Sequence, residues 1–453
     1  MRRALAGLQE QPLTMSTSLD GELRWILDTE RSAIAEVHAT LARELDGWPD
    51  KFPEDMTHDI HVCRFLRGHK HDADAAAKAM TGAIKYRTAF IAQNESVRTM
   101  RANLGDTLDL TLLPNNEEVL RCLPVRAVAK GLSAGSGLPL AIVPIRLVEP
   151  RLFSDMGDKL EFFIRCLLEA RALVLHKLSL RQQRMVKFFE VRDFNNVHVS
   201  ELILHGRHII QNLKDIIRSL QDHYPEVLHQ VLIAHAPTTF SKLFSLVSSV
   251  LNERMRNKIF VIPATAKFEQ VACLLDANAL HTWGQLVNNN SSSGKAADGG
   301  WGGSTGVTVA NMGCEFVTRW LEKGETLKWK VRLSSGESIR VFAYWMAEAP
   351  SSSGGASGGG NGGNGGSGTM APRAQAELLQ DVALKAEEAC DGSYTAEAAS
   401  GVVWLCADNV ASWWYEKVVH ASLITIQPSS TPDEKVEAKV EALAEATAAV
   451  DLD

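Results

Sequence analysis

The sequence lacks the long apolar runs and the excess of positive charge that mark two common classes of protein. No stretch approaches the roughly 18 apolar residues that a membrane-spanning helix requires. The net charge is -7, which argues against nucleic acid as a main partner. Any contact with a membrane is therefore expected to be peripheral.

Cysteine is sparse and shows no pairing pattern. The chain has 7 cysteines among 453 residues, and none forms a Cys-x-x-Cys pair. An odd, scattered set fits reduced thiols better than a disulfide framework. The basic N-terminus, MRRALAGLQEQPL, has no apolar core of the kind found in signal peptides. These features predict a cytoplasmic protein.

Motifs for catalysis and metal binding are also missing. The sequence contains no P-loop, Gly-x-Ser-x-Gly or His-Glu-x-x-His motif, so we predict no catalytic residues. The order of His58, His61, Cys63, His69 and His71 matches no standard zinc-finger spacing. We therefore expect no enzyme activity, no metal site and no cofactor apart from a bound ligand.

Three segments are too polar or too simple to build a core. Residues 287–306 and 350–368 are rich in Gly, Ser and Asn and are expected to be flexible. The second stretch fits a long loop inserted within one domain. An acidic tail, 428–453, reads as an exposed helix that starts after Pro432.

The apolar spacing over 21–92 predicts helices, beginning with Leu23, Leu27 and Ile34. Within this region "FLRGHKHDADAAAKAM" joins two helical segments at a corner. Gly68 fits a left-handed residue that ends the first segment, and Asp72 or Asp74 fits the cap of the second.

The rest of the chain changes its pattern twice. Between 138 and 286, apolar strands such as "RMVKFFEVRDF" and "KIFVI" alternate with helical segments, which indicates a mainly parallel sheet covered by helices. Between 307 and 427, "ETLKWKVRL" and "ESIRVFAYWM" alternate at period two. That pattern favours an antiparallel β-sandwich.

Three segments carry a resemblance to known families. "DIHVCRFLRGHKHDADAAAKAM" and "LQDHYPEVLHQVLIAHAPTTFSKLFSLVSSVLNERMRNKIFVI" resemble CRAL-TRIO proteins of the yeast phosphatidylinositol transfer type. "GVVWLCADNVASWWYEKVVHASLIT" is similar to the closing strands of a GOLD domain. The resemblance implies a multidomain chain with these parts: a helical subdomain (20–95), an α/β lipid-binding domain (96–285), a linker (286–306), an all-β GOLD sandwich (307–427, insertion 350–368) and the tail (428–453).

The resemblance also implies a function and a set of site residues. Its members hold a phospholipid or another hydrophobic ligand in an internal pocket and exchange it at intracellular membranes, such as the Golgi, as peripheral proteins. The implied head-group residues are Glu226, Lys258, His69 and Lys70. The implied gate is a helix over 239–254 with the apolar stripe Phe240, Leu243, Phe244, Val247, Val250 and Leu251. Phe188 and Phe189 are expected to line the pocket.

Several alternatives stay open at this level. Glu226 and Lys258 could instead be an ordinary surface ion pair. Met255 replaces a hydrogen-bonding residue of the relatives, and the two phenylalanines make a choline lipid doubtful, so a neutral lipid such as a tocopherol, retinoid or sterol precursor competes with phosphatidylinositol. A different class of function is an adaptor that binds a protein partner through the GOLD-like part.

Overall fold

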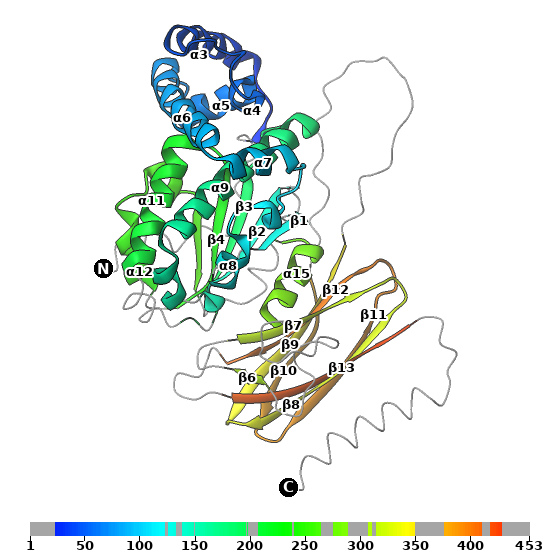
Figure 1. Cartoon of the computed structure of the whole chain (residues 1–453). Coiled ribbons are helices and arrows are strands. Elements are labelled where there is room, and N and C mark those ends of the chain that lie inside the picture. Colours follow the sequence, from blue (N-terminus) through cyan, green and yellow to red (C-terminus); the bar gives the residue numbers. More distant parts are fainter. Residues whose placement is uncertain are drawn as a thin grey trace, which may run out of the picture. The chain divides into compact units, whose positions relative to one another are not determined.

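The computed structural model forms two compact units (Figure 1). The first comprises residues up to 263 except 132–137, and the second comprises 132–137 and everything from 264. The structure describes residues 23–122, 126–132, 138–148, 150–195, 197, 207–237, 240–263, 275–288, 307–309, 314–348, 376–409 and 417–427. The predicted insertion 350–368 and the tail 428–453 lie outside these residues, as does most of the predicted linker.

The first unit starts with helices, as the apolar spacing predicts. These are α3 (Arg31–Glu44), α4 (Glu54–Thr57), α5 (Asp59–Gly68), α6 (Ala73–Gln93), α7 (Glu95–Asn103) and α8 (Asn116–Cys122), with short 3-10 turns at Asp28–Glu30 and Leu110–Leu112. The core between α3, α5 and α6 contains Ile34, Leu41, Phe65 and Met80. Leu27 is not helical, because the Glu30 carboxylate accepts its N–H at 2.9 Å and so caps the 3-10 turn that follows, and its side chain is 40% exposed.

The corner between α5 and α6 differs from the sequence prediction in one detail. Gly68 is the last residue of α5 and is not left-handed; the positive φ angles belong to Lys70 (56°) and His71 (65°). The chain therefore reverses over two residues after the helix rather than at the glycine. The predicted cap is confirmed, since the Asp72 carboxylate accepts the N–H of Ala75 at 2.9 Å.

A five-stranded sheet follows, in the order β1-β2-β3-β4-β5. Its strands are β1 (Arg126–Leu132), β2 (Pro139–Pro144), β3 (Phe188–Asp193), β4 (Leu228–Ala236) and β5 (Ile259–Pro263), and β2 to β5 are parallel. The connecting helices are α9 (Pro150–Gln182), α11 (Arg207–His223), α12 (Phe240–Ser248) and α13 (Glu253–Arg256). Because the strands follow in sequential order and such crossovers are right-handed, α9, α11 and α12 lie on one face (Figure 1).

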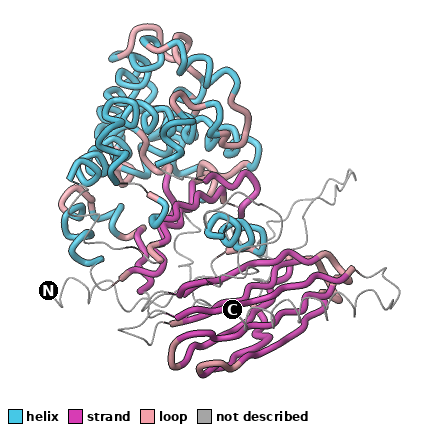
Figure 2. Tube along the Cα trace, turned by 60° about the horizontal axis from the view of Figure 1, so that its bottom comes forward, coloured by secondary structure: helices cyan, strands magenta, loops and turns pink. Residues whose placement is uncertain are grey.

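Within its described residues, the second unit consists of strands and one helix (Figure 2). Its strands are β6 (Val307–Val309), β7 (Cys314–Leu321), β8 (Thr326–Ser335), β9 (Ser338–Ala347), β10 (Glu377–Lys385), β11 (Ala389–Thr395), β12 (Gly401–Asp408) and β13 (Lys417–Ile426). They form two four-stranded antiparallel sheets, β10-β9-β12-β7 and β11-β8-β13-β6. Both sheets contribute to one core, which includes Trp329, Val331, Val341 and Leu405. The predicted antiparallel all-β region is confirmed.

Helix α15 (Ala277–Asn288) belongs to this second unit and packs against β7 and β12. The Trp283 side chain is fully buried, and its ring centroid lies 5.6 Å from that of Phe316. A Cβ atom at Gly284 would lie 2.2 Å from the Thr318 Oγ1 atom, so only glycine allows this approach of helix to strand.

Candidate functional site

Three charged residues meet at the amino edge of the parallel sheet. Lys187, Glu226 and Lys258 stand just before β3, β4 and β5, and the amino ends of adjacent parallel strands share one edge. The Glu226 Oε2 atom lies 2.5 Å from Lys187 Nζ and 3.0 Å from Lys258 Nζ. We call these three residues the amino-edge cluster.

The amino-edge cluster is buried rather than exposed. The side chains of Glu226 and Lys258 are 3% and 6% exposed, which excludes the surface ion pair that the sequence left open. Burial alone would raise the pKa of Glu226, but the charges of Lys187 and Lys258 hold this pKa well below its usual range. Arg254 adds a third cation, with its Nε atom 2.5 Å from Glu226 Oε1. Among the described side chains, three cations thus surround one carboxylate.

The other two predicted head-group residues lie on the corner between α5 and α6. The Nδ1 atom of His69 lies 2.9 Å from the carbonyl oxygen of Phe65, and its ring stacks on the Phe65 ring. Lys70 is exposed. The corner approaches the cluster at Gly68, where a Cβ atom would lie 3.4 Å from Pro225 Cβ. The structure therefore joins Glu226 to Lys258 directly, and places His69 and Lys70 on the neighbouring corner.

Sequence reasoning missed Lys187, which is fully buried. A signal was present, because a lysine just before a strongly apolar strand occurs twice, at Lys187 before "FFEV" and at Lys258 before "IFVI". A buried lysine needs a carboxylate partner, and Glu226 is positioned to serve both.

The gate stripe is divided by the end of α12. Phe240, Leu243 and Phe244 pack with Val231 and Ile233 of the sheet. The predicted helix 239–254 is interrupted, because α12 ends at Ser248 and α13 starts at Glu253. Val250 and Leu251 therefore lie in a turn and are not helical, contrary to the prediction.

Gln221 of α11 explains this break. Its side-chain amide donates to the carbonyl of Val250 at 2.9 Å and accepts the N–H of Asn252 at 2.9 Å. These two bonds satisfy backbone groups that a continuous helix would otherwise pair. Within α12, Ser245 and Ser248 donate to carbonyls of their own helix, so their hydroxyls add little polarity to its surface.

The two phenylalanines of β3 point to opposite faces of the sheet, because side chains alternate along a strand. Phe188 lies on the face of the crossover helices, where the guanidinium of Arg171 on α9 stacks on its ring at 5.2 Å. Phe189 is buried on the other face. Only Phe188 is on the same face as α12, so the prediction that both line one pocket is wrong for Phe189.

A second buried charge network joins the first helices to α9 and α11. Arg87 of α6 pairs with Asp55 at 3.0 Å and with Glu169 at 2.7 Å, and Arg101 of α7 contacts the same two carboxylates. The Tyr224 hydroxyl donates to Glu169 at 2.8 Å. Burial would raise the pKa of Asp55, yet the charges of Arg87 and Arg101 lower it to about 2. This network holds α6 and α7 against α9 and the end of α11.

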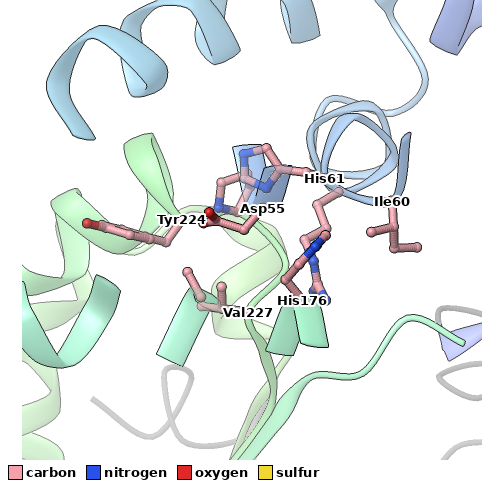
Figure 3. Close-up of a pocket in the computed structure, with 9 residues that line it drawn as sticks. Asp55, Ile60, His61, His176, Tyr224 and Val227 are labelled. Atoms are coloured by element: carbon pink, nitrogen blue, oxygen red, sulfur yellow. The ribbon is translucent and has the colours of Figure 1, made fainter. Parts of the chain in front are cut away.

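A small cavity lies beside this network, between α4, α5, α9 and the start of β4 (Figure 3). It has room for roughly one water. His61 and His176 line it, and within the described residues the His61 Nε2 and His176 Nδ1 atoms have no hydrogen-bond partner. Its size suits a solvent molecule and not a lipid chain.

Two further searches cover only the described part of the chain. There, no group of three or more His, Cys, Asp or Glu side chains is placed to hold a metal ion. In the same residues, no helix is both long enough and apolar enough to cross a bilayer.

Comparison with known proteins adds a domain assignment. Residues 136–278 match the family model of the CRAL/TRIO domain. A curated relative, the CRAL-TRIO domain-containing protein C34C12.6 of Caenorhabditis elegans, is 21% identical over 248 residues, which cover 52% of this chain and 58% of the relative. The chain thus spans somewhat more than half the length of that relative.

Two solved structures show weaker likeness. The crystal structure of Sfh5 aligns with a TM-score of 0.38 and 16% identity, covering 56% of this chain and 86% of that one. The crystal structure of tripeptidyl peptidase 2 aligns with a TM-score of 0.18 and 11% identity, over 26% of this chain and 8% of the other. Scores this low do not establish a shared fold.

Proposed function

We propose that the chain is a lipid carrier that encloses one lipid between α12 and the sheet, because residues 136–278 match the family model of the CRAL/TRIO domain. The observation that carries this proposal is the apolar surface between these elements. Phe244, Ile259 and Val261 pack there but remain only partly buried. Apolar side chains left partly open between a helix and a sheet gain free energy when a lipid chain covers them.

The carrier exchanges its lipid at membranes as a peripheral, non-enzymatic protein of the cytoplasm. Movement of α12 away from the sheet opens the apolar surface. Gln221 limits the moving part, because it holds the turn after α12 to α11.

Phosphatidylinositol is the ligand we favour, bound with its phosphate near the amino-edge cluster. Supporting this, the cluster brings three cations around Glu226, so the local field favours an anion. His69 and Lys70 stand on the corner beside it. Arg254 is 35% exposed, which gives this edge a cation that solvent and a head group can reach.

Two measurements test these proposals. Mass spectrometry of an organic extract of the purified chain should show a co-purifying lipid in stoichiometric amount; a lipid-free extract together with no vesicle transfer would refute the carrier function. Lys258→Met should lower phosphatidylinositol transfer at least about tenfold and leave tocopherol transfer unchanged. Lys242→Met, an exposed lysine of α12, is the matched control. Unchanged phosphatidylinositol transfer in Lys258→Met would leave the amino-edge cluster a structural feature and favour a neutral lipid.

A second candidate concerns the all-β unit, for which we propose a GOLD-like role in binding a protein partner. Strand β10 is an edge strand of its sheet, and its Leu378 is 50% exposed. Exposed edges pair readily with other chains. Trp404 does not contribute to such a surface, because it is buried and stacks on Tyr344. Leu378→Lys should abolish capture of that partner while lipid transfer continues.

A further inference from the structure

A third charged cluster lies on the sheet face beneath α12, separate from the amino-edge cluster and from the network around Arg87. Glu190 of β3 accepts a hydrogen bond from Arg171 Nη1 of α9 at 3.0 Å and from Arg192 Nη2 at 2.9 Å. Burial would raise the pKa of Glu190, but the two arginines lower it to about 2, so the carboxylate is charged. We call Arg171, Glu190 and Arg192 the floor cluster.

The strand register shows what surrounds the floor cluster. Paired residues of parallel strands point to the same face, so two rows cross the sheet here. One row is Ala141, Glu190, Val231 and Ile259, and the other is Val143, Arg192, Ile233 and Val261. In each row of four, the residue from β3 is charged and the other three are apolar. Val231, Ile233, Ile259 and Val261 also pack with the side chains of α12.

The floor cluster has more donors than acceptors. Two guanidinium groups face one carboxylate, which leaves one positive charge. Arg171 is 8% exposed, and among the described residues its Nε atom has no hydrogen-bond partner. Burying such a donor without an acceptor costs about 1–3 kcal/mol, so the arrangement is incomplete without an acceptor. Arg192 is 32% exposed, so its guanidinium is accessible to a ligand.

We propose that Arg171 and Arg192 bind the carboxylate of a long-chain acid whose chain lies along the two apolar rows beneath α12. The inference rests on the proposed carrier function and adds a second class of ligand, a long-chain acid, beside phosphatidylinositol. A single carboxylate matches the single excess charge, and the guanidinium fork suits its two oxygens. The two rows contain no side chain that would serve the hydroxyls of a sugar head group, which favours an end group without them.

The test compares oleate with methyl oleate, which has the same chain but no charge, in binding to the full-length protein. The unchanged protein should bind oleate more tightly than methyl oleate. Arg192→Met should weaken oleate binding at least about tenfold and leave methyl oleate binding unchanged. Arg218→Met, an exposed arginine of α11 paired with Asp215, should change neither.

A variant expected to bind oleate more tightly separates an effect on binding from an effect on folding. Glu190→Gln removes the carboxylate that competes with the ligand, so oleate should bind several-fold more tightly to a protein with unchanged circular dichroism. If Glu190→Gln unfolds the protein, Arg192→Met still decides, because its partly exposed side chain is not needed for the core.

The outcomes distinguish this inference from the carrier function. Equal loss of oleate and methyl oleate in Arg192→Met, no preference for oleate in the unchanged protein, or an equal loss of phosphatidylinositol transfer would overturn the carboxylate site. If phosphatidylinositol or tocopherol still binds in that case, the carrier function stands. Absence of binding for every lipid overturns both.

Discussion

The Nη1 atom of Arg64 donates to the carbonyl oxygen of Glu226 at 2.8 Å, and this bond ties helix α5 to the entrance of strand β4. The Nη2 atom of the same guanidinium donates to Ser179 Oγ at 3.1 Å and to the carbonyl of Val186 at 2.8 Å. One buried arginine therefore holds the hairpin corner against α9 and two strand entrances. It also helps to keep Gly68, at the end of α5, next to Pro225.

Replacement of Arg64 should loosen this contact. Arg64→Met removes the Arg64 donor from two buried carbonyls, those of Glu226 and Val186, which should destabilise the first unit by about 3 kcal/mol. Faster hydrogen exchange of the α5 and α6 amides measures the effect. Arg98→Met is the control, because the exposed Arg98–Glu95 pair should contribute less than about 1 kcal/mol. Equal exchange in both variants would contradict the role given to Arg64.

The amino-edge cluster should respond unequally to loss of its members. Glu226→Gln leaves Lys187 and Lys258 buried without the carboxylate they share, and should cost about 3–5 kcal/mol in urea unfolding at pH 7. Lys258→Met leaves Glu226 paired with Lys187 and Arg254 and should cost clearly less. A greater loss for the lysine variant would mean that Lys258 has a larger structural role than its bonds to Glu226 and the Leu228 carbonyl indicate.

The two faces of α12 provide a matched test of the gate. Phe244 packs toward the sheet, whereas Leu246 is 38% exposed. Phe244→Asp should slow lipid transfer between vesicles at least about tenfold, because it places a charge on the apolar surface of α12 that faces the lipid chain. Leu246→Asp should leave the rate of lipid transfer between vesicles unchanged. If transfer in Phe244→Asp equals that of the unchanged protein, α12 is only a core helix.

Stability should fall on mild acidification because of His176. Burial lowers the pKa of His176 to about 4, with Arg64 acting in the same direction, and the pKa of His61 is also lowered. Above the unfolded value of about 6.5, both folded and unfolded states are neutral and nothing is lost. Between about 6.5 and 4 the unfolded chain binds a proton that the folded chain excludes, so the free energy of unfolding falls by about 3 kcal/mol.

Urea unfolding at pH 7, 6 and 5 measures this loss, and His176→Gln should flatten the dependence. Asp55 and Glu190 do not account for a loss in this range, because their lowered pKa values act only below about pH 4.5. An unchanged slope in the His176 variant would assign the effect to other groups.

The sequence alone was sufficient to predict most of the helices and strands and part of the candidate site. Periodicity located α6, β3 and β5, and the capping chemistry of Asp72 placed the start of α6 correctly. Glu226 and Lys258 came from a resemblance, yet the structure joins them directly. What periodicity could not supply were pairings across long separations: Arg64 with Glu226, Lys187 with Glu226, and Arg171 with Glu190. The end of α12 was also missed, because it depends on Gln221 of another helix.

Helix α15 sets a practical limit on how the protein can be divided. The CRAL/TRIO match ends at residue 278, just inside this helix. The rest of the helix belongs to the all-β unit, because Trp283 packs against Phe316 and Gly284 against Thr318, both in β7. An all-β fragment that starts after the end of the match would keep Trp283 but lose the first two residues of α15 and the Asp276 carboxylate, which accepts the N–H of Ala279 at 2.7 Å. It would also lose the bond from the Asn278 amide to Glu348 at 3.2 Å. Separate expression of the all-β unit should therefore begin before Asp276 and keep α15 whole with its cap.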